Sequence, residues 1–241
     1  MADTLVLLHG ANGSAEEMRP LAERMPAGIT VFRPDWLGHG GRPAPDDDYG
    51  VDTIIADLEL LLDAAGIGRC FLFGYSIGGY LALVLASRRP ERARGVATLA
   101  ARHVWHPHAV AHLVHLATPE RLTRPGNPRA AELAAIHHPT DWTRVNAANR
   151  RLFASLQTEG ALNDAAVRAI AAPGLVLNAT ADPLVPVAES HALAACFRTW
   201  RLGLFPGSAH PFRDAPLDDI ATVLADFVRD VSDRDQAPAG T

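Results

Sequence analysis

One short stretch around residue 76 constrains the fold of this chain more than any other part of the sequence. An apolar run at residues 71–73 leads into Gly-Tyr-Ser-Ile-Gly at residues 74–78, and a second apolar run follows at 81–85. A serine on a sharp turn between a strand and a helix has strained backbone angles, so the residues two positions before and after it must be small. The two glycines meet this requirement. The spacing therefore predicts a buried strand, a tight turn that presents Ser76, and a helix that begins directly after it.

The rest of the chain alternates between apolar runs typical of buried strands and segments with helical periodicity. Strands are expected at residues 4–8, 29–33, 71–73, 95–100, 173–178 and 198–204, and helices at 14–25, 52–65, 77–89, 187–196 and 217–231. Between residues 102 and 171 the chain has no convincing strand, only helical segments at 107–116, 129–137, 141–156 and 164–170. Strands that alternate with helices favour a parallel sheet covered on both faces. The sequence thus predicts an α/β fold with a core at 1–101 and 172–241 and a helical insert at 102–171.

Composition and charge exclude several classes of protein. The chain has 241 residues and a formal net charge of −5, which argues against a nucleic-acid partner. No apolar run is long enough to cross a membrane, and the first residues lack the basic and apolar regions of a secretory signal, so a cytoplasmic location is expected. All 22 basic residues are arginine, which excludes lysine chemistry such as a Schiff base. The two cysteines, Cys70 and Cys196, fit a reducing compartment.

Three of the expected strands are each followed by a chemically useful side chain. Ser76 follows one strand, Asp182 follows the strand at 173–178, and His210 follows the strand at 198–204. Because the carboxyl ends of parallel strands meet at one edge of a sheet, we expect these side chains to lie close together. A serine needs a base to take its proton, and the base needs a carboxylate that fixes its tautomer. We therefore predict a catalytic triad, with a helix N-cap for Asp182 and an ordinary loop histidine for His210 as the alternatives.

Five short motifs, in this order, resemble those of the α/β-hydrolase superfamily, and in particular its cap-bearing serine esterases. The motifs are His9-Gly10, Asp35-x-x-Gly38-His39-Gly40, Gly74-Tyr75-Ser76-Ile77-Gly78-Gly79, Asp182 before Pro-Leu-Val-Pro, and Gly207-Ser208-Ala209-His210. The resemblance implies a mostly parallel sheet with helices on both faces, and an oxyanion hole formed by the N–H groups of Ala11 and Ile77. It also implies that residues 102–171 form a cap domain, or lid, over the edge of the sheet. Asp35 and His39 are expected to brace their loop rather than to react.

The chain departs from the family pattern at positions that narrow the choice of activity. Haloalkane dehalogenases and epoxide hydrolases of this fold carry aspartate at the turn, so Ser76 argues against both. The menaquinone-pathway synthases of similar size usually carry arginine where this chain has Tyr80, which disfavours their substrate. Arg42 stands where the family often has serine.

The predicted insert is rich in histidine and contains most of the residues expected to line a substrate pocket. His108, His112 and His115 share one helix face, a spacing at which imidazoles can bind a metal ion. No cysteine or carboxylate nearby in sequence completes a zinc site, so we predict a half-exposed face and no metal. Arg102 is expected to be solvated, with contact to a substrate carboxylate as the alternative. The predicted substrate-binding residues are Tyr75, Trp105, Trp142 and Phe153.

These residues favour the hydrolysis of a carboxylic ester, or a related acyl bond, through an acyl-enzyme on Ser76. The expected partner is a small ester-like molecule, and no metal or organic cofactor is expected. The same triad also fits a C–C bond hydrolase or lyase, or a thioesterase, because selectivity depends on the pocket rather than on the fold. A ligand receptor of the same fold with slow turnover is the alternative from another class. The sequence carries no signal for the oligomeric state.

Overall fold

A six-stranded sheet forms the centre of the molecule in the computed structural model, which describes residues 3–45, 49–156, 162–207 and 209–236. The strands are β1 (Asp3–Leu8), β2 (Ile29–Phe32), β3 (Cys70–Tyr75), β4 (Ala93–Leu99), β5 (Gly174–Ala179) and β6 (Trp200–Phe205). Their order in the sheet is β2-β1-β3-β4-β5-β6, and every neighbouring pair is parallel. The expected α/β architecture is confirmed.

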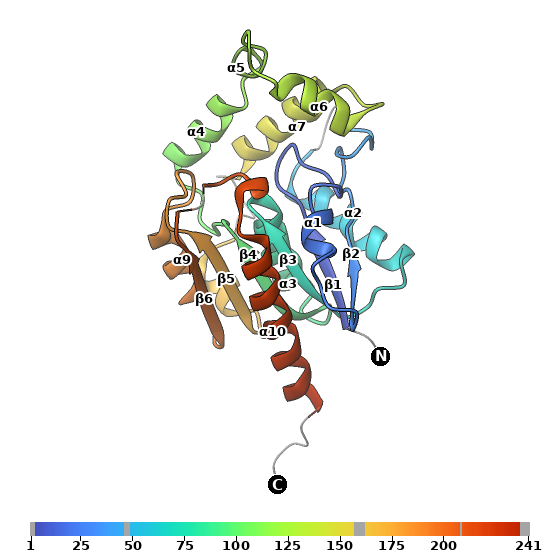
Figure 1. The fold of residues 1–241 in the computed structure, drawn as a ribbon, viewed down its shortest axis with the longest axis vertical. Helices are drawn as coiled ribbons and strands as arrows, with labels where there is room; N and C mark the ends of the chain where they lie inside the picture. The colour runs from blue at the N-terminus through green and yellow to red at the C-terminus, as the bar shows by residue number, and fades with distance from the viewer. Residues whose placement is uncertain (1–2, 46–48, 157–161, 208, 237–241) are drawn as a thin grey trace.

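Helices cover both faces of this sheet (Figure 1). They are α1 (Arg19–Ala22) and α10 (Leu217–Gln236) on one face, and α2 (Val51–Ala64), α3 (Ile77–Arg88) and α9 (Val187–Ala194) on the other. Successive side chains of a strand point to opposite faces, so Leu5 and Phe73 pack toward α10 while Val6 and Leu72 pack toward α2 and α3. Burial on both faces explains why the strands read as continuous apolar runs.

The first helix is much shorter than the helix expected at residues 14–25. Only Arg19–Ala22 is α-helical, and before it the chain forms single turns such as the bond from the N–H of Glu17 to the carbonyl of Ser14 (3.0 Å). Pro20 explains the difference, because proline has no N–H for an i−4 bond and its ring clashes with the preceding turn. Proline is tolerated in the first turn of a helix, and that is where Pro20 lies.

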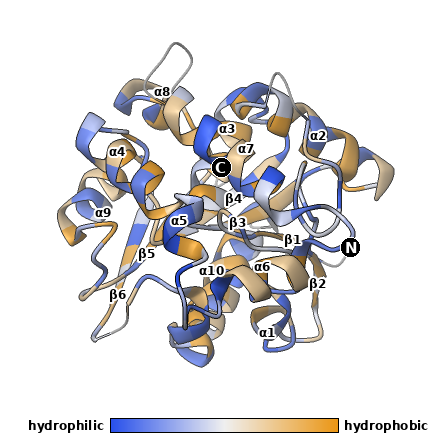
Figure 2. Ribbon diagram, turned by 90° about the horizontal axis from the view of Figure 1, so that it is seen from above, coloured by the Kyte–Doolittle hydropathy of each residue, from blue (hydrophilic) through white to orange (hydrophobic). Residues whose placement is uncertain are grey.

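Between β4 and β5, the residues that the structure describes form helices and loops and no strand. The helices are α4 (Pro107–Leu116), α5 (Pro119–Leu122), α6 (Arg129–His137), α7 (Trp142–Ser155) and α8 (Asp164–Arg168), here called the helical insert. Helices α4 to α7 lie above the carboxyl ends of the strands in Figure 1 and over the sheet when the molecule is seen from above in Figure 2. The insert therefore stands at the edge where parallel sheets build their sites.

The last helix, α10, is longer than expected and extends to Gln236 rather than to residue 231. Its apolar stripe, which includes Ile220, Leu224 and Phe227, packs against the sheet. Neither α10 nor any other helix of the described residues has the length and apolar character needed to span a membrane.

Candidate active site

The turn between β3 and α3 presents Ser76 in a strained conformation. Its φ and ψ are 54° and −121°. A Cβ added to Gly74 would lie 2.2 Å from the carbonyl oxygen of Gly78, and one added to Gly78 would lie 2.4 Å from the carbonyl oxygen of His9. Both contacts are to backbone atoms, so no larger residue fits at either position. The glycines allow the turn that presents Ser76 at the carboxyl edge of the sheet.

Three side chains from three strand ends meet at this turn. Ser76 Oγ lies 3.1 Å from Nε2 of His210, and Nδ1 of His210 lies 2.8 Å from Oδ2 of Asp182. Asp182 follows β5 and His210 follows β6, as the sequence predicts. Ser208, part of the predicted motif before the histidine, lies outside the described residues. The arrangement is a serine, a base and a carboxylate joined by hydrogen bonds.

The carboxylate of Asp182 is buried, and both of its oxygens accept hydrogen bonds. Its side chain has no exposed surface, and its Oδ1 accepts hydrogen bonds from the N–H groups of Leu184 (2.7 Å) and Val185 (3.0 Å). Burial acts to raise the pKa of Asp182, but the hydrogen bond and charge of His210 and these two N–H groups outweigh it and lower the pKa. The site therefore keeps this group ionised, as a partner for an imidazolium must be.

Tyr75, one of the four predicted pocket residues, holds the loop that carries His210. Its hydroxyl donates a hydrogen bond to the carbonyl oxygen of His210 (2.8 Å), and its ring packs against the rings of His210 and Phe212 at 5.4 and 5.2 Å between centroids. Tyr75 is 7% exposed. The strand that presents the serine is therefore bonded directly to the loop of the base.

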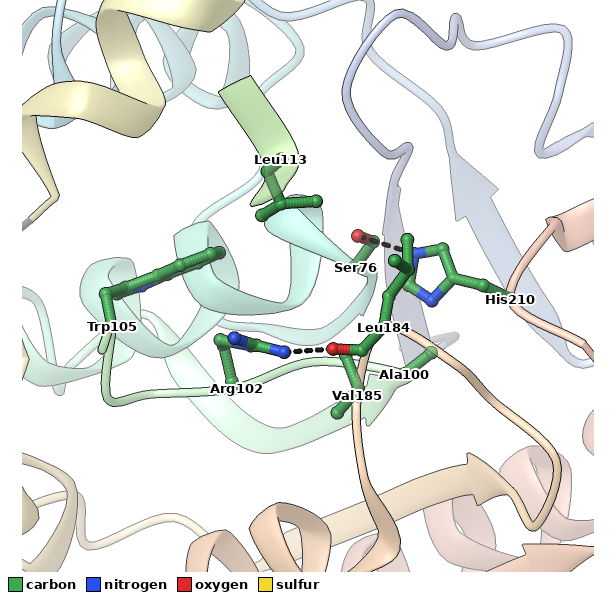
Figure 3. Close-up of a pocket in the computed structure, with 8 residues that line it drawn as sticks. All are labelled: Ser76, Ala100, Arg102, Trp105, Leu113, Leu184, Val185 and His210. Atoms are coloured by element: carbon green, nitrogen blue, oxygen red, sulfur yellow. Dashed lines mark hydrogen bonds between the residues drawn. The ribbon is translucent and has the colours of Figure 1, made fainter. Parts of the chain in front are cut away.

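A small hollow opens beside the serine, between the sheet edge and the insert (Figure 3). It is lined by Ser76, Ala100, Arg102, Trp105, Leu113, Leu184, Val185 and His210. Its volume is about 20 Å³, which is close to the room one water molecule needs. Of the predicted pocket residues, Trp105 lines the hollow, Phe153 packs behind it at 6.2 Å between ring centroids, and Trp142 begins α7 and is not part of the lining.

Arg102 is buried, which corrects the expectation that it is solvated. Only 6% of its side chain is exposed. Its Nη2 donates to the carbonyl oxygen of Leu184, and its Nε lies 3.1 Å from Oε2 of Glu189. Burial lowers the pKa of the guanidinium, while Glu189 and Asp182 oppose that shift. The only signal in the sequence is the position of Arg102 at the end of a buried strand, because its partners lie much further along the chain.

The N–H groups predicted to form an oxyanion hole lie on neighbouring segments. Ile77 is the first residue of α3, so its N–H belongs to the turn that has no partner within the helix. Ala11 follows β1, which pairs with β3, in a turn closed by the bond from the N–H of Gly13 to the carbonyl of Gly10 (3.1 Å). An added Cβ on Gly10 would lie 3.6 Å from the Cβ of Ser76, so this turn approaches the serine closely.

A buried seam of polar groups joins the insert to the loop after β2. Nδ2 of Asn149 in α7 donates to Nε2 of His39 (3.0 Å) and to Oδ1 of Asn12 (2.9 Å). The N–H of Gly40 donates to Nδ1 of His137 in α6 (3.3 Å). His39, His137 and Asn149 have no exposed surface. Sequence reasoning expected His39 to brace its loop, but it missed the two partners from the insert, whose spacing gives no such signal.

The histidines of this seam, and His9 beside His39, are held in their neutral form. Burial lowers the pKa of His9 to about 3 and that of His137 to about 4, and it also lowers the pKa of His39. The ring of His39 lies 5.0 Å from the ring of His9 and 5.5 Å from the ring of His137. A proton on one of them would therefore be poorly solvated and close to the others.

Arg42 and Asp35 secure the same loop from its other side. Arg42 forms a two-pronged ion pair with Asp57 (2.7 and 2.6 Å) and donates to the carbonyl oxygen of Asp35 (2.7 Å). Oδ1 of Asp35 accepts from the N–H of Ala15 (2.6 Å). The arginine that replaces the family's usual serine thus has a bracing role.

Two groups of possible metal ligands bear on the expectation that no metal takes part. His108, His112 and His115 on α4 are exposed. Elsewhere, donor atoms of His103, Asp164 and Cys196 lie within 4.8 Å of one another. His103 and Asp164 line a second hollow, which shares Arg102 with that of Ser76, and their side chains are hydrogen-bonded at 2.9 Å. The absence of a metal from the reaction stays a prediction.

Comparison with known proteins identifies the class. The model of the alpha/beta hydrolase fold family matches residues 3–162, and the chain belongs to this family. It is therefore an enzyme of the hydrolase class.

Individual relatives cover most of the chain. RutD of Variovorax paradoxus, named as a proposed carbamate hydrolase, is 31% identical over 95% of this chain and 93% of its own length. The pimeloyl-[acyl-carrier protein] methyl ester esterase of Aromatoleum aromaticum is 30% identical over 93% of this chain and 98% of its own length. The bifunctional biotin biosynthesis protein BioHC of Cellvibrio japonicus is 27% identical, and the chain spans 47% of its length. A thermophilic esterase from Thermogutta terrifontis has a similar structure, with a TM-score of 0.77, 20% identity, and coverage of 95% of this chain and 90% of that one.

Proposed function

We propose that this chain hydrolyses carboxylic esters, or related acyl bonds, through an acyl-enzyme on Ser76. The observation that carries the proposal is the hydrogen-bonded series from Ser76 through His210 to Asp182, with distances of 3.1 and 2.8 Å. The names of the two full-length relatives, an ester hydrolase and a proposed carbamate hydrolase, support acyl chemistry.

In the first half of the proposed reaction, Ser76 Oγ attacks the carbonyl carbon of the ester. His210 takes the hydroxyl proton on Nε2 and then donates it to the leaving alcohol as the carbon–oxygen bond breaks. Asp182 accepts the Nδ1–H of His210, which fixes the tautomer and stabilises the imidazolium. The N–H groups of Ala11 and Ile77 bind the oxygen that becomes negative, and their fixed dipoles need no rearrangement.

In the second half, a water molecule takes the place of the alcohol. His210 removes a proton from this water, which attacks the acyl carbon, and returns the proton to Ser76 Oγ as the acid product leaves. None of these steps requires a metal or an organic cofactor. The helical insert, proposed as residues 102–171, acts as the lid that encloses the acyl group, and Trp105 forms part of the wall.

The test compares the wild type with Ser76→Ala on p-nitrophenyl esters of increasing acyl length. The substitution removes only the hydroxyl, so the thermal midpoint should stay close to that of the wild type. We expect kcat/KM to fall by about 10⁴-fold or more, because binding and the oxyanion hole alone give little turnover. A serine-reactive phosphonate should add its mass to Ser76 in the wild type and not in the variant.

Substantial ester hydrolysis by a folded Ser76→Ala variant would contradict the proposal. If the phosphonate labels Ser76 but no ester turns over, the serine is reactive and the bond class is different, so thioesters and C–C substrates are tried next. A slow-turnover receptor would instead bind its ligand tightly and release it very slowly.

A further inference from the structure

Two hydrogen-bond donors on residues that line the hollow beside Ser76 lack a partner among the described residues. They are Nη1 of Arg102 and Nε1 of Trp105, and both atoms are buried. Both residues line the hollow that also contains Ser76 and His210. Buried polar atoms in folded proteins nearly always have a partner, so two orphans in one hollow require an explanation.

The rest of each side chain is held firmly. Arg102 is fixed at Nη2 by the carbonyl oxygen of Leu184 (Figure 3). Its Nε forms an ion pair with Glu189, which leaves one NH₂ group unused. The ring of Trp105 lies 5.5 Å from the guanidinium carbon of Arg102 and 5.5 Å from the ring of Tyr80. Both donors are therefore buried beside the hollow on side chains that have neighbours on their other sides.

The chemistry of these donors defines what they can bind. A guanidinium NH₂ and an indole N–H donate hydrogen bonds and accept none, so the missing partner is an acceptor, which in a substrate is most simply an oxygen atom. Glu189 already offsets much of the charge of Arg102. A neutral carbonyl oxygen and a carboxylate oxygen both meet the requirement, whereas a hydrocarbon chain would leave both donors unpaired.

The position of the hollow beside Ser76 indicates which part of the substrate carries that oxygen. In the proposed function, the alcohol must leave after the first step while the acyl group stays bonded to Ser76 until water attacks. A small hollow between the sheet edge and the insert suits the part that stays. Its volume of about 20 Å³ is room for about one water molecule, so even a short acyl group requires the lining side chains to move when it enters.

We propose that Arg102 and Trp105 bind an oxygen atom in the acyl part of the substrate. The enzyme then selects esters whose short acyl chain carries a carbonyl or carboxylate oxygen a few carbons from the ester. This inference rests on the proposed function and adds the substrate class to it.

The test uses three methyl esters of nearly equal shape, with the release of methanol as the readout. Methyl 4-methylpentanoate ends in two methyl groups, methyl 4-oxopentanoate ends in a ketone, and monomethyl succinate ends in a carboxylate. The same set with one more methylene in the chain covers a longer reach. For the wild type we expect kcat/KM of at least one oxygen-bearing ester to exceed that of the matched hydrocarbon ester by about tenfold or more.

Two variants assign this preference to the two donors. Arg102→Met removes the guanidinium and keeps an unbranched side chain, and Trp105→Phe removes the N–H and keeps an aromatic ring. Each should lower the ratio of oxygen-bearing to hydrocarbon ester, measured within the same variant, toward one. Arg124→Met, at an exposed arginine of the insert, is the matched control and should keep the wild-type ratio.

Each outcome decides the inference. A wild type that prefers no oxygen-bearing ester over its matched hydrocarbon ester at either length overturns it, and so does a preference that survives both substitutions. An equal loss on all three esters in Arg102→Met, with no change of ratio in Trp105→Phe, would make Arg102 only a brace for Leu184 and would also overturn it. A preference for the ketone over the carboxylate supports a neutral acceptor, and the reverse supports an anion. If the wild type hydrolyses none of these esters nor any p-nitrophenyl ester, the proposed function itself fails.

Discussion

The carboxyl ends of the strands and the helical insert contribute to one site in opposite ways. At the strand ends, Ser76, His210 and Asp182 are each hydrogen-bonded to the next, and Asp182 is buried with both oxygens engaged. On the side where the insert begins, Arg102 and Trp105 present donors with no partner in the described part of the chain. The difference teaches that the polar groups at the strand ends satisfy one another, whereas in our proposal the donors of Arg102 and Trp105 are satisfied by the substrate.

The largest expected effect tests the strand-end half. Asp182→Asn keeps an oxygen that can accept from the N–H groups of Leu184 and Val185, so the fold should remain. It loses the negative charge and favours the wrong tautomer of His210, and we expect kcat on a p-nitrophenyl ester to fall by about 10⁴-fold. A loss below about tenfold, with an unchanged thermal midpoint, would show that Asp182 only shapes its turn.

The second prediction concerns the seam that joins the two halves. His9 and His137 have folded pKa values of about 3 and 4, below the ordinary 6.5, because burial disfavours their charged form. The unfolded chain therefore binds more protons than the folded chain between pH 6.5 and 4. The free energy of unfolding should fall as pH decreases through this range, by up to about 1.4 kcal/mol per pH unit for each such histidine.

Two variants test whether a histidine of the seam, rather than one on the outer face of the insert, causes this pH dependence. His137→Asn offers an oxygen to the N–H of Gly40 and does not titrate, so urea unfolding should show a shallower dependence on pH. His112→Asn, on the exposed face of α4, should keep the wild-type dependence. Equal slopes in the wild type and in His137→Asn would remove His137 from the explanation.

The smallest expected effect concerns metal. Treatment with a chelator should leave ester hydrolysis unchanged, and His112→Ala should change the free energy of unfolding by no more than about 0.5 kcal/mol, as is usual for exposed positions. Inactivation by the chelator that added zinc reverses would contradict this. The group formed by His103, Asp164 and Cys196 would then be the first site to mutate.

The sequence predicted the strand-end half well because its signals are local. The two glycines around Ser76 are dictated by backbone contacts at 2.2 and 2.4 Å, so the motif and the turn have the same cause. The parallel sheet follows from the alternation of strands and helices, and it is confirmed. The prediction of the first helix was wrong because Pro20 cannot lie in the middle of a helix, so the helix begins only one residue before it.

The sequence predicted the main helices of the insert closely, but it missed their contacts with the core, because these contacts join residues that are far apart in the chain. Nothing near Arg102 in the sequence announces its bonds to Leu184 and Glu189, so it was expected in solvent. The bond between Asn149 and His39 likewise joins α7 to a loop near the start of the chain. Such pairs become visible only when the fold has brought the two segments together.

The hydrogen bond from Tyr75 to the carbonyl of His210 links the loop of His210 to the strand that presents Ser76 without a contribution from the helical insert. The residue next to the serine holds the loop of the base, so the spacing between the two groups is set within the core alone. Over generations, the helices above can be lengthened, shortened or exchanged while that spacing survives. A chain built in this way can acquire new substrates without having to reinvent its chemistry.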